Sequence, residues 1–431
     1  MTDRVRFFRE EDWTVGVVGL GYIGLPLLMT AVPSGLRAIG FDVAEQRIAD
    51  LEEGISHVDD VSSDSIVAQL GTNLRFTEHA SELAEADAIF ICVPSPLGRN
   101  REPDLSHIAT ASNMITDVAR PGQLISLEST TYPGTTEDYI LPAVEKAGLT
   151  LDHDVWVAYS PERVSPGDSL KTGQIPKVVG GISAASGEVA AAAYQRIVPV
   201  VHLVSSSRVA EMTKLLENTY RAVNIGLINE IAQLSHELDI DIWEVVDAAA
   251  TKPFGFQPFY PGPGVGGHCI PLDPQYLAWR AREVNFPTRF IETADQVNAH
   301  MPEYTVQRIV ELLNDDGRSV KGSTILVIGI AYKPDVSDDR ESASVEVAVR
   351  LLKKGADVAV IDPYLDEDRI AQHGFTVATA EDDFDRYQIA VVLTDHTDIP
   401  YETIARSVQT VFDARGVYRR LGIDAANVET L

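Results

Sequence analysis

Short apolar runs alternate with helix-compatible stretches through about the first 160 residues of the chain. The first run, 13–19, passes into a glycine-rich turn and then into an apolar helical pattern at 25–32. Further apolar runs lie at 37–41, 88–93, 123–127 and 155–159, with a helix-compatible stretch at 105–119. Strands that alternate with helices are typical of a parallel, doubly wound sheet. The pattern therefore predicts an α/β region at the N-terminus.

At about residue 205 the pattern becomes helical. Over 205–236, apolar residues recur at helical spacing: Val209, Met212, Leu215, Leu216, Val223, Leu227, Ile231 and Leu234. Helices are also predicted at 242–250, 275–284 and 290–298, with a loop rich in Gly, Pro and aromatic residues at 251–269. After a polar hinge at 314–319, apolar runs return at 324–330, 356–361, 389–393 and 410–413. The chain is therefore predicted to be α/β, then helical, then α/β.

Length and composition exclude several classes of protein. The 431 residues are 45% hydrophobic, enough for the cores of two to three domains. No apolar run reaches the roughly 18 residues of a membrane-spanning helix, and the charged segment 1–13 lacks the apolar core of a signal peptide. Two cysteines, Cys92 and Cys269, cannot build a disulfide framework or a cysteine-rich zinc site. We therefore expect a cytoplasmic protein without membrane partners.

The chain is strongly acidic. It has 64 Asp and Glu against 35 Lys and Arg, for a formal net charge of −29. Such a charge repels nucleic acid, so a nucleic-acid partner is disfavoured. An acidic surface of this kind suits a high-salt cytoplasm, where ions screen its self-repulsion. A moderately acidic protein of an ordinary cytoplasm is the alternative.

Gly19-x-Gly21-x-x-Gly24 follows the first predicted strand and opens a helix. Glycines at this spacing allow a tight turn, a close approach to a pyrophosphate and close packing of helix on strand. Asp42 ends the next predicted strand, 18 residues after Gly24, where a carboxylate can accept hydrogen bonds from ribose hydroxyls. We predict a dinucleotide site that prefers NAD, although the nearby Arg47 leaves NADP open. A purely structural glycine turn is the alternative.

The second α/β region has no such fingerprint, because its first turn reads Gly-Ile-Ala-Tyr-Lys-Pro-Asp over 329–335. Lys333, Arg340 and Arg415 are expected where the first, second and last pieces of this region end. Open α/β sheets place ligands at that edge, and such cations suit an anionic, phosphate-bearing substrate. Solvated surface charges are the alternative.

Cys269 follows Gly262, Gly264, Gly266 and Gly267 in a loop whose backbone can approach a ligand closely. A lone cysteine is usually a small buried apolar residue. The glycine loop, the adjacent His268 and Asp273 four residues on favour a nucleophile instead. No Cys-x-x-Cys or His-x-His spacing accompanies it, so we predict no metal.

Three further polar groups are candidates for a site. Lys214, Asn218 and Arg221 share one face of the long predicted helix, as either a site or a solvated stripe. The segment 160–163, Ser-Pro-Glu-Arg, follows the predicted last strand of the first region, and 129–131, Ser-Thr-Thr, follows the strand before it. Catalytic groups of such sheets collect at strand ends.

Together these segments resemble the UDP-sugar 6-dehydrogenases over essentially the whole chain. The motifs that carry the resemblance occur in the family's order: GLGYIG, ESTTYPGTT, SPER, AEMTKLLENTYRAVNIGLINE, GPGVGGHCIPLDP, AYKPDVSDDRES and FDAR. The resemblance implies an α/β protein with two Rossmann-like doubly wound domains joined by a helical central region. The NAD-binding domain would span 1–204, the central dimerisation domain 205–314 and the UDP-binding domain 315–431. It also implies a homodimer formed through the central helices.

The resemblance also implies roles for particular residues. Cys269 would be the nucleophile; Lys214, Asn218 and Asp273 would hold and activate water and stabilise the oxyanion; Glu162 and Thr130 would complete proton handling. The cofactor would contact Gly19, Gly21, Tyr22, Ile23, Gly24, Asp42, Arg47, Val93, Pro94, Ser95, Thr130 and Arg340. The substrate would contact Glu162, Arg163, Lys214, Asn218, Arg221, Tyr260, Gly262, Gly264, Gly266, Lys333 and Arg415.

The implied reaction is a four-electron oxidation of C6 of a UDP-sugar by NAD, through a cysteine thioester. NREPDLSHI, IPKVVGG and the loop 251–269 look most like the UDP-N-acetylglucosamine branch, with UDP-N-acetylmannosamine close behind. Two departures from the UDP-glucose enzymes are Pro166, where they carry a second glutamate, and Lys252-Pro253, where they carry an arginine. A β-hydroxyacid dehydrogenase and an NAD sensor without turnover are the rival hypotheses. A β-hydroxyacid dehydrogenase needs neither Cys269 nor a second α/β domain. An NAD sensor leaves the expected catalytic residues unexplained.

Overall fold

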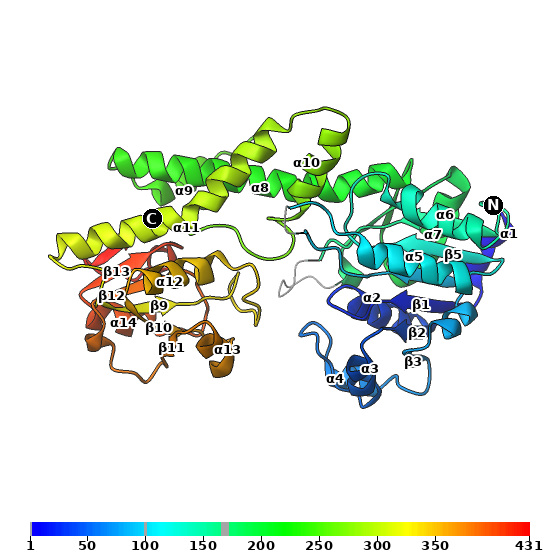
Figure 1. Cartoon of the computed structure of the whole chain (residues 1–431), viewed down its shortest axis with the longest axis horizontal. Coiled ribbons are helices and arrows are strands. Elements are labelled where there is room, and N and C mark those ends of the chain that lie inside the picture. Colours follow the sequence, from blue (N-terminus) through cyan, green and yellow to red (C-terminus); the bar gives the residue numbers. More distant parts are fainter. Residues whose placement is uncertain (1, 99–100, 165–171) are drawn as a thin grey trace. The chain divides into compact units, whose positions relative to one another are not determined.

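The computed structural model describes residues 2–98, 101–164 and 172–431 (Figure 1). The chain divides into two compact units, each with its own sheet. The first consists of Met1–Glu217 and Gln275–Phe286, and the second of Asn218–Pro274 and Pro287–Leu431.

The first unit is built on a sheet in the order β3-β2-β1-β4-β5-β6-β7-β8. Its strands are β1 (Thr14–Val18), β2 (Arg37–Phe41), β3 (Leu74–Thr77), β4 (Ala88–Ile91), β5 (Gln123–Leu127), β6 (Val155–Tyr159), β7 (Lys177–Gly181) and β8 (Val201–Val204). The six strands β1 to β6 are parallel and follow the order of a dinucleotide-binding Rossmann sheet. This confirms the α/β prediction for the N-terminal region.

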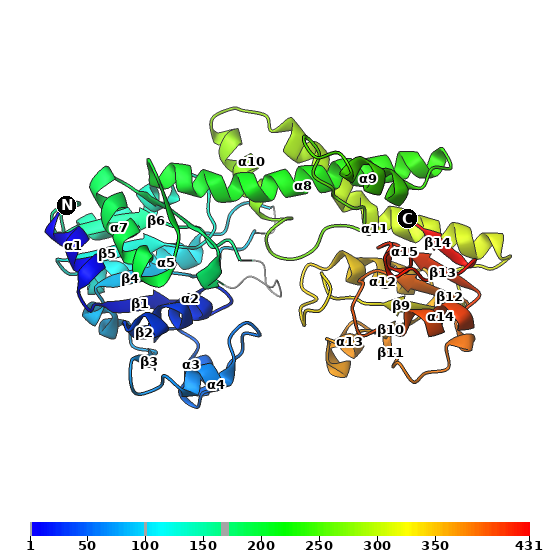
Figure 2. The same cartoon turned by 180° about the vertical axis from the view of Figure 1, so that it is seen from behind.

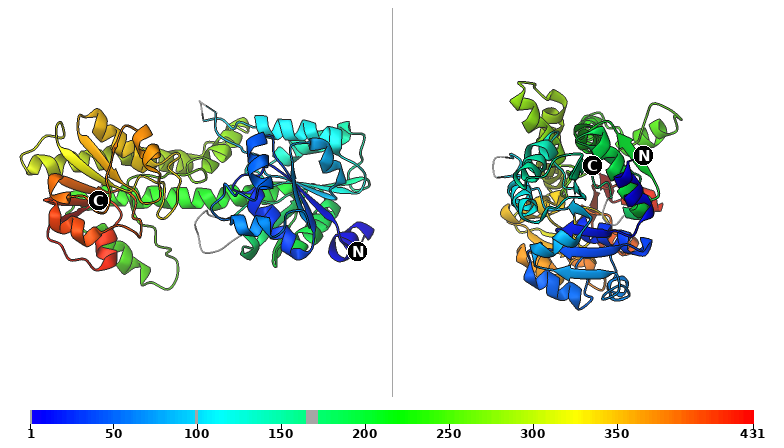
Figure 3. Two further views of the ribbon diagram at one scale, coloured as in Figure 1. Left: turned by 90° about the horizontal axis from the view of Figure 1, so that it is seen from below. Right: turned by 90° about the vertical axis from the view of Figure 1, so that its right-hand side faces the viewer.

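Helices cover both faces of this sheet, as the left-hand view of Figure 3 shows. One face packs against α1 (Asp3–Glu10), α2 (Gly24–Ala31) and α7 (Ala184–Ile197), and the other against α5 (Ser106–Val118) and α6 (Leu141–Lys146). Two shorter helices, α3 (Glu45–Glu52) and α4 (Ser63–Val67), lie between β2 and β3 in the chain. Every residue of β1 is buried, which explains why its sequence is apolar without alternation.

Three strands at the edges of this sheet, β3, β7 and β8, were absent from the sequence prediction. The prediction made β6 the last strand of the first region, whereas β7 and β8 follow it, and β7 pairs with β6 antiparallel. β7 carries Gly180 and Gly181 in its second half, and glycine is depleted in strands. A Cβ at Gly180 would lie 2.1 Å from the Ser206 carbonyl oxygen, so close backbone packing requires the glycine.

The second unit repeats the strand order of the first six strands, as β11-β10-β9-β12-β13-β14 (Figure 2). Its parallel strands are β9 (Thr324–Ile328), β10 (Asp357–Ile361), β11 (Thr376–Val377), β12 (Ile389–Val392), β13 (Thr410–Asp413) and β14 (Val428–Thr430). One face packs against α11 (Arg289–Asp315) and α12 (Ala343–Lys353), the other against α14 (Tyr401–Ser407) and α15 (Val417–Leu421). The short α13 (Glu367–Gln372) precedes β11. Two Rossmann-like sheets are thus confirmed.

The helical region comprises α8 (Ser207–Glu237), α9 (Ile242–Ala250), α10 (Asp273–Glu283) and α11. The sequence predicted that the last helix ends near residue 298, but α11 continues through Pro302 to Asp315. Proline usually ends or bends a helix. Here Met301, Val306 and Ile309 are buried against the second sheet, and this packing outweighs the cost of the proline.

The long helix α8 exposes much of the apolar face that the sequence identified. Leu216, Leu227 and Leu234 are each more than half exposed, at 58%, 57% and 53%. Leu215 is fully buried, so α8 has one covered and one uncovered apolar side.

Among the described residues, no helix is long and apolar enough to cross a membrane. The three-domain division stays a prediction.

Candidate active site

The glycine turn of the first unit has the shape that the fingerprint predicts. Gly19 adopts a φ of +88°, and its N–H donates to the Phe41 carbonyl at 2.9 Å. A Cβ at Gly24 would lie 1.8 Å from the Gly19 carbonyl oxygen, so α2 can begin there only with glycine. A Cβ at Gly21 would meet no atom within 4 Å. The turn therefore leaves open space beside Gly21, before the uncapped start of α2, which suits a pyrophosphate.

Asp42 lies directly after β2, as predicted, and is almost fully buried. Its carboxylate accepts the N–H groups of Leu20 at 2.8 Å and Ala44 at 2.9 Å, and pairs with Arg47 at 2.8 Å. Burial opposes the charge, but these N–H groups and Arg47 outweigh it and lower the pKa of Asp42. His57 Nε2 lies 2.8 Å from the Leu20 carbonyl oxygen, a contact that sequence spacing does not predict.

The other residues expected at the cofactor lie after β4, after β5 or in the glycine turn, except Arg340, which belongs to the second unit. Val93, Pro94 and Ser95 follow β4, and their backbone is fixed by two hydroxyl groups. Ser129 Oγ donates to the Val93 carbonyl at 2.6 Å, and Tyr276 Oη donates to the Ser95 carbonyl at 2.7 Å. Thr130 follows β5 and is half-buried, while Tyr22 and Ile23 lie in the glycine turn.

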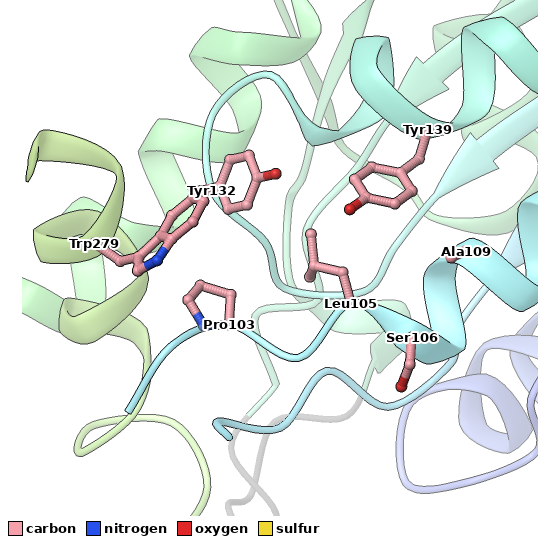
Figure 4. A pocket seen from close by; sticks show the side chains of 7 residues that line it. All are labelled: Pro103, Leu105, Ser106, Ala109, Tyr132, Tyr139 and Trp279. Carbon is pink, nitrogen blue, oxygen red and sulfur yellow. The ribbon is translucent and has the colours of Figure 1, made fainter. Parts of the chain in front are cut away.

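An aromatic cavity of about 270 Å³ lies on the α5 side of the first unit (Figure 4). Its walls are formed by Pro103, Leu105, Ser106, Ala109, Tyr132, Tyr139 and Trp279. The Tyr132 ring packs against Trp279 with centroids 5.0 Å apart, and burial raises the pKa of Tyr132 to about 12. None of the predicted site residues lines this cavity, so it is separate from the predicted cofactor contacts.

Glu162 follows β6 in a buried, charged environment. Its Oε1 accepts the N–H groups of Arg163 at 2.6 Å and Val164 at 2.8 Å, and its Oε2 accepts Lys177 Nζ at 3.1 Å. Burial opposes ionisation, but Lys177 and the two N–H groups outweigh it and lower the pKa of Glu162. The side chain of Arg163 is engaged by Glu217, with Nη2 at 2.6 Å from Oε1. Pro166 lies outside the described residues.

The polar face of α8 is divided by burial. Lys214 and Asn218, one helical turn apart, are buried, whereas Arg221 is exposed. A solvated stripe would expose all three, so the first two fit the site interpretation and Arg221 fits a surface charge.

In the second unit, the turn after the glycine loop gathers three of the predicted catalytic residues. The N–H of Asp273, the first residue of α10, donates to the Cys269 carbonyl at 2.9 Å. Asn218 Nδ2 donates to Asp273 Oδ2 at 2.5 Å, and both of these side chains are buried. Cys269 is exposed, whereas Cys92 is buried. The turn thus holds an accessible thiol next to a fixed amide–carboxylate pair.

The glycine loop itself packs tightly against other segments of the second unit, to which it belongs. A Cβ at Gly262 would lie 2.6 Å from Arg415 Nη1, one at Gly264 2.7 Å from Ala343 Cβ, and one at Gly266 2.8 Å from the Glu341 carbonyl oxygen. The sequence attributed these glycines to close approach of a ligand, whereas here the close approach is to the chain itself. Tyr260 ends the aromatic part of this loop, stacked on Trp243 with centroids 5.6 Å apart.

The three predicted cations of the second sheet lie on two loops. Lys333 and Arg340 both lie between β9 and α12, so the expectation that Arg340 ends a second piece of this region was wrong. No strand separates the two residues, because 329–342 form one connection between β9 and α12. Arg340 forms a two-pronged pair with Asp338 at 2.8 and 2.6 Å. Arg415 follows β13, with Nε 3.3 Å from Asp395 Oδ1.

Family models match most of the chain. The NAD-binding, central and UDP-binding domains of the UDP-glucose/GDP-mannose dehydrogenase family match residues 13–198, 208–300 and 326–420. A UDP-N-acetyl-D-glucosamine 6-dehydrogenase of Pseudomonas aeruginosa is 36% identical over 372 residues, 85% of this chain and 86% of that protein. A UDP-N-acetyl-D-mannosamine dehydrogenase of Methanococcus maripaludis is 34% identical over 385 residues, 88% of this chain and 85% of that protein.

A solved structure agrees in fold over nearly the whole chain. The UDP-D-ManNAc dehydrogenase from Pyrococcus horikoshii matches with a TM-score of 0.87 and 29% identity. The match covers 97% of this chain and 98% of that one.

Proposed function

The chain belongs to the UDP-glucose/GDP-mannose dehydrogenase family, and on that premise we propose that it oxidises C6 of a UDP-N-acetylhexosamine to the uronic acid. Family membership makes it an NAD-dependent nucleotide-sugar dehydrogenase. UDP-N-acetylglucosamine is the substrate we favour, and UDP-N-acetylmannosamine and UDP-glucose are the alternatives. The observation that carries the proposal is the exposed Cys269 in the turn that Asn218 and Asp273 hold.

NAD accepts a hydride in each of the two oxidation steps. The residues we expect to hold it are those of the glycine turn, with Gly21 beside the open space and Asp42 after β2. Asp42 already holds the turn through the Leu20 N–H, so the residue that recognises a ribose also shapes the phosphate site.

In the proposed reaction the C6 alcohol first loses a proton and a hydride to become an aldehyde. The Cys269 thiolate adds to the aldehyde carbon, and the resulting hemithioacetal loses a second hydride to become a thioester. Water hydrolyses the thioester, which releases the uronic acid and restores the thiolate. Each sugar therefore reduces two NAD.

The other catalytic residues act on charge and water. Lys214 would stabilise the oxyanion of both tetrahedral species, an effect of roughly 3–4 kcal/mol for one good donor. Asn218 and Asp273 would orient the hydrolytic water, which their 2.5 Å hydrogen bond and burial support. Glu162 and Thr130 would handle protons near the reacting carbon. Lys333 and Arg415 would bind the UDP moiety.

The sugar is the least determined part of the proposal. Relatives named for UDP-N-acetylglucosamine and for UDP-N-acetylmannosamine are nearly equally similar to this chain. Lys252-Pro253, where UDP-glucose enzymes carry an arginine, favours a pocket with room beside C2. A site built for an acetamido group leaves its partner unpaired with a plain hydroxyl and discriminates strongly against it.

The test is NADH production with the three UDP-sugars at matched concentration, together with the Cys269→Ala variant. We expect two NADH per sugar, a preference for UDP-N-acetylglucosamine, and no uronic acid from Cys269→Ala. The Cys92→Ala variant is the matched control, because that thiol is buried. A preference for UDP-glucose would overturn the substrate, and acid formation by Cys269→Ala at the original rate would overturn the mechanism.

We also propose that the protein is a homodimer assembled through α8. The support is the exposed apolar face formed by Leu216, Leu227 and Leu234, which a stable surface helix would not leave in water. Leu227→Asp is expected to halve the mass measured by light scattering, whereas Val67→Asp, at an exposed apolar position elsewhere, leaves it unchanged. An unchanged mass of a Leu227→Asp variant would contradict this interface.

Finally, we propose that the acidic chain is adapted to high salt. A net charge of −29 repels itself over about 10 Å at 0.1 M salt but only about 3 Å at 1 M. The thermal midpoint should therefore rise steeply between low and molar KCl, and a flat series would show that the acidity is incidental. The cytoplasmic location stays a prediction.

A further inference from the structure

Lys177, the first residue of β7, is a lysine buried between two carboxylates. Its side chain is 3% exposed, and Glu128 and Glu162 beside it are 0% and 9% exposed. Nζ pairs with Glu128 Oε2 and lies 3.1 Å from Glu162 Oε2. Lysine is rarely buried so deeply without charged partners, and a surface role is excluded.

Glu128 connects this lysine to the core of the first sheet. It follows β5, and its second oxygen accepts the Tyr194 hydroxyl from α7, which in turn lies 2.9 Å from Ser126 Oγ. Burial and the neighbouring Glu162 charge raise the pKa of Glu128, although Lys177 opposes them. Glu128 therefore anchors Lys177 at one end of a fully buried network.

The cluster places one cation among two carboxylates. The other titratable groups that face it are Cys92 after β4, Tyr194 on α7, and Arg163, which is itself paired with Glu217. Burial, with Glu128 and Glu162, raises the pKa of the Cys92 thiol, so this thiol stays protonated. The charged state of the Glu162 carboxylate therefore depends on Lys177.

We propose that Lys177 is a positioning residue of the reaction, whose ammonium group holds the Glu162 carboxylate in place and charged while Glu128 anchors the lysine. The proposal rests on the proposed function, in which Glu162 acts beside the substrate. Oε1 of Glu162 takes two backbone N–H groups and Oε2 takes Lys177, so the carboxylate has no freedom to rotate. Such fixing of a catalytic group is a large source of rate.

Removing the lysine charge leaves two buried carboxylates facing each other without a cation. Two such groups share a proton, because like charges in a poorly solvated place cannot both ionise easily. Glu128, whose pKa burial raises, takes that proton, while Glu162 loses the cation that favours its charged form, so the pKa of Glu162 rises above that in the unaltered enzyme. The acidic limb of the pH profile of kcat/KM reports this change.

The decisive experiment compares pH profiles of NADH production by Lys177→Gln, Lys177→Arg and the double variant Lys177→Gln/Glu128→Gln. In Lys177→Gln the acidic limb should move up by at least about one pH unit, so the loss of kcat/KM should be greatest at the lowest pH measured. Lys177→Arg should keep the limb where it was. The double variant should show the same limb as Lys177→Gln, because Glu128 already holds the shared proton at the pH where Glu162 titrates.

A purely structural lysine gives a different outcome. Lys177→Gln would then lose activity equally at every pH, and the double variant would be worse than the single one. If Lys177→Gln does not fold, a shifted limb in Lys177→Arg overturns the proposal by itself. Arg120→Met, which breaks the Arg120–Asp87 pair in the same unit, is the control for general destabilisation. An unaltered enzyme inactive with all UDP-sugars would instead overturn the proposed function.

Discussion

Asp42 and Asp362 occupy the same position in the two sheets, directly after the second strand of each. Each carboxylate accepts the N–H of the residue that follows the first glycine of the turn, Leu20 or Ile330, at 2.8 Å. The glycines agree as well, since the N–H of each donates to the last residue of the second strand at 2.9 Å. One backbone design therefore appears twice in the chain.

The surroundings of the two aspartates differ. Asp42 pairs with Arg47, whose side chain is 37% exposed, whereas Asp362 lies 3.1 Å from Nε2 of His396, whose side chain is fully buried. The ring of Tyr364 stacks on His396 with centroids 4.9 Å apart. In the second unit an imidazole therefore faces the carboxylate, where the first unit has an arginine. Strand order and an aspartate thus shape the turn, and the neighbours decide whether it has room for a dinucleotide.

The turns themselves differ at two glycines. Counted from Gly19 and Gly329, Gly21 corresponds to Ala331 and Gly24 to Pro334. The second turn therefore carries a side chain at the place where the first has open space.

One way to test the comparison is to make the first turn resemble the second. Gly21→Ala should raise the KM for NAD at least about tenfold with an unchanged thermal midpoint, because the new methyl group enters only the open space. Gly24→Ala should also lower the thermal midpoint, since its Cβ would lie 1.8 Å from the Gly19 carbonyl oxygen. Steady-state kinetics and thermal melts of both variants provide the test, with Ala331→Gly as control. An unchanged KM in Gly21→Ala would contradict the assignment of this turn.

His396→Ala should lower the stability of the fold and leave the KM for NAD unchanged. It removes the partner of a buried carboxylate, which costs about 3–5 kcal/mol of unfolding free energy. Denaturant unfolding measures the loss, and Arg47→Ala, at the exposed counterpart, should cost about 1 kcal/mol or less. A KM for NAD that rises in His396→Ala would show that the second sheet also serves the dinucleotide.

The sheets were predictable because their strands are buried on both faces. β2, β5, β6 and β13 have the predicted bounds, since a parallel strand between two helical layers is mostly apolar. β7 was missed because its glycines weaken the strand pattern, and α11 was cut short because local proline chemistry takes no account of the core beneath it. Local pattern does not carry the information that tertiary packing adds.

The candidate site was predictable where a motif carried it. The glycine turn, Asp42 and the Cys269 turn follow from spacing alone, and Lys214 and Asn218 from a polar interruption of an apolar helix. Lys177 lies in the segment IPKVVGG, which resembles the family, but it was not predicted as a site residue, because a lone lysine in a strand is usually solvated. Its burial between carboxylates from two other strand ends is visible only in three dimensions.

Coenzyme choice sharpens the comparison further. Asp42 should repel the 2′-phosphate of NADP, so kcat/KM with NADP should be about 100-fold below that with NAD, a difference of about 2.7 kcal/mol. Asp42→Asn should narrow this ratio, because Arg47 would lose its charged partner and become available to a phosphate. Asp362→Asn is the matched control and should leave the ratio unchanged. Equal kcat/KM for the two coenzymes in the unaltered enzyme would refute the role of Asp42.

Two buried carboxylates, Glu211 and Asp362, have pKa values that move in opposite directions. Glu211 on α8 accepts the N–H groups of Gly134 at 2.6 Å and Thr136 at 2.9 Å, but burial dominates and raises its pKa from 4.5 to about 7. Asp362 is also buried, but His396 and backbone N–H groups outweigh burial and lower its pKa below 3.8. A raised carboxyl pKa means that the folded state binds the extra proton, so stability falls as pH rises.

The contribution of Glu211 should therefore be complete below pH 4.5 and lost as pH rises through about 7, whereas that of Asp362 should be lost only as pH falls below 3.8. The loss at Glu211 amounts to at most about 3 kcal/mol. Glu211→Gln cannot titrate, so its unfolding free energy minus that of the unaltered protein should increase between pH 4.5 and 7. The corresponding difference for Asp362→Asn should show no such trend in this window, because Asp362 of the unaltered protein is ionised throughout it. If the difference in unfolding free energy for Glu211→Gln stays flat, the hydrogen bonds from Gly134 and Thr136 keep the Glu211 carboxylate charged despite its burial. Asp362 would then be its counterpart, kept charged by partners of its own.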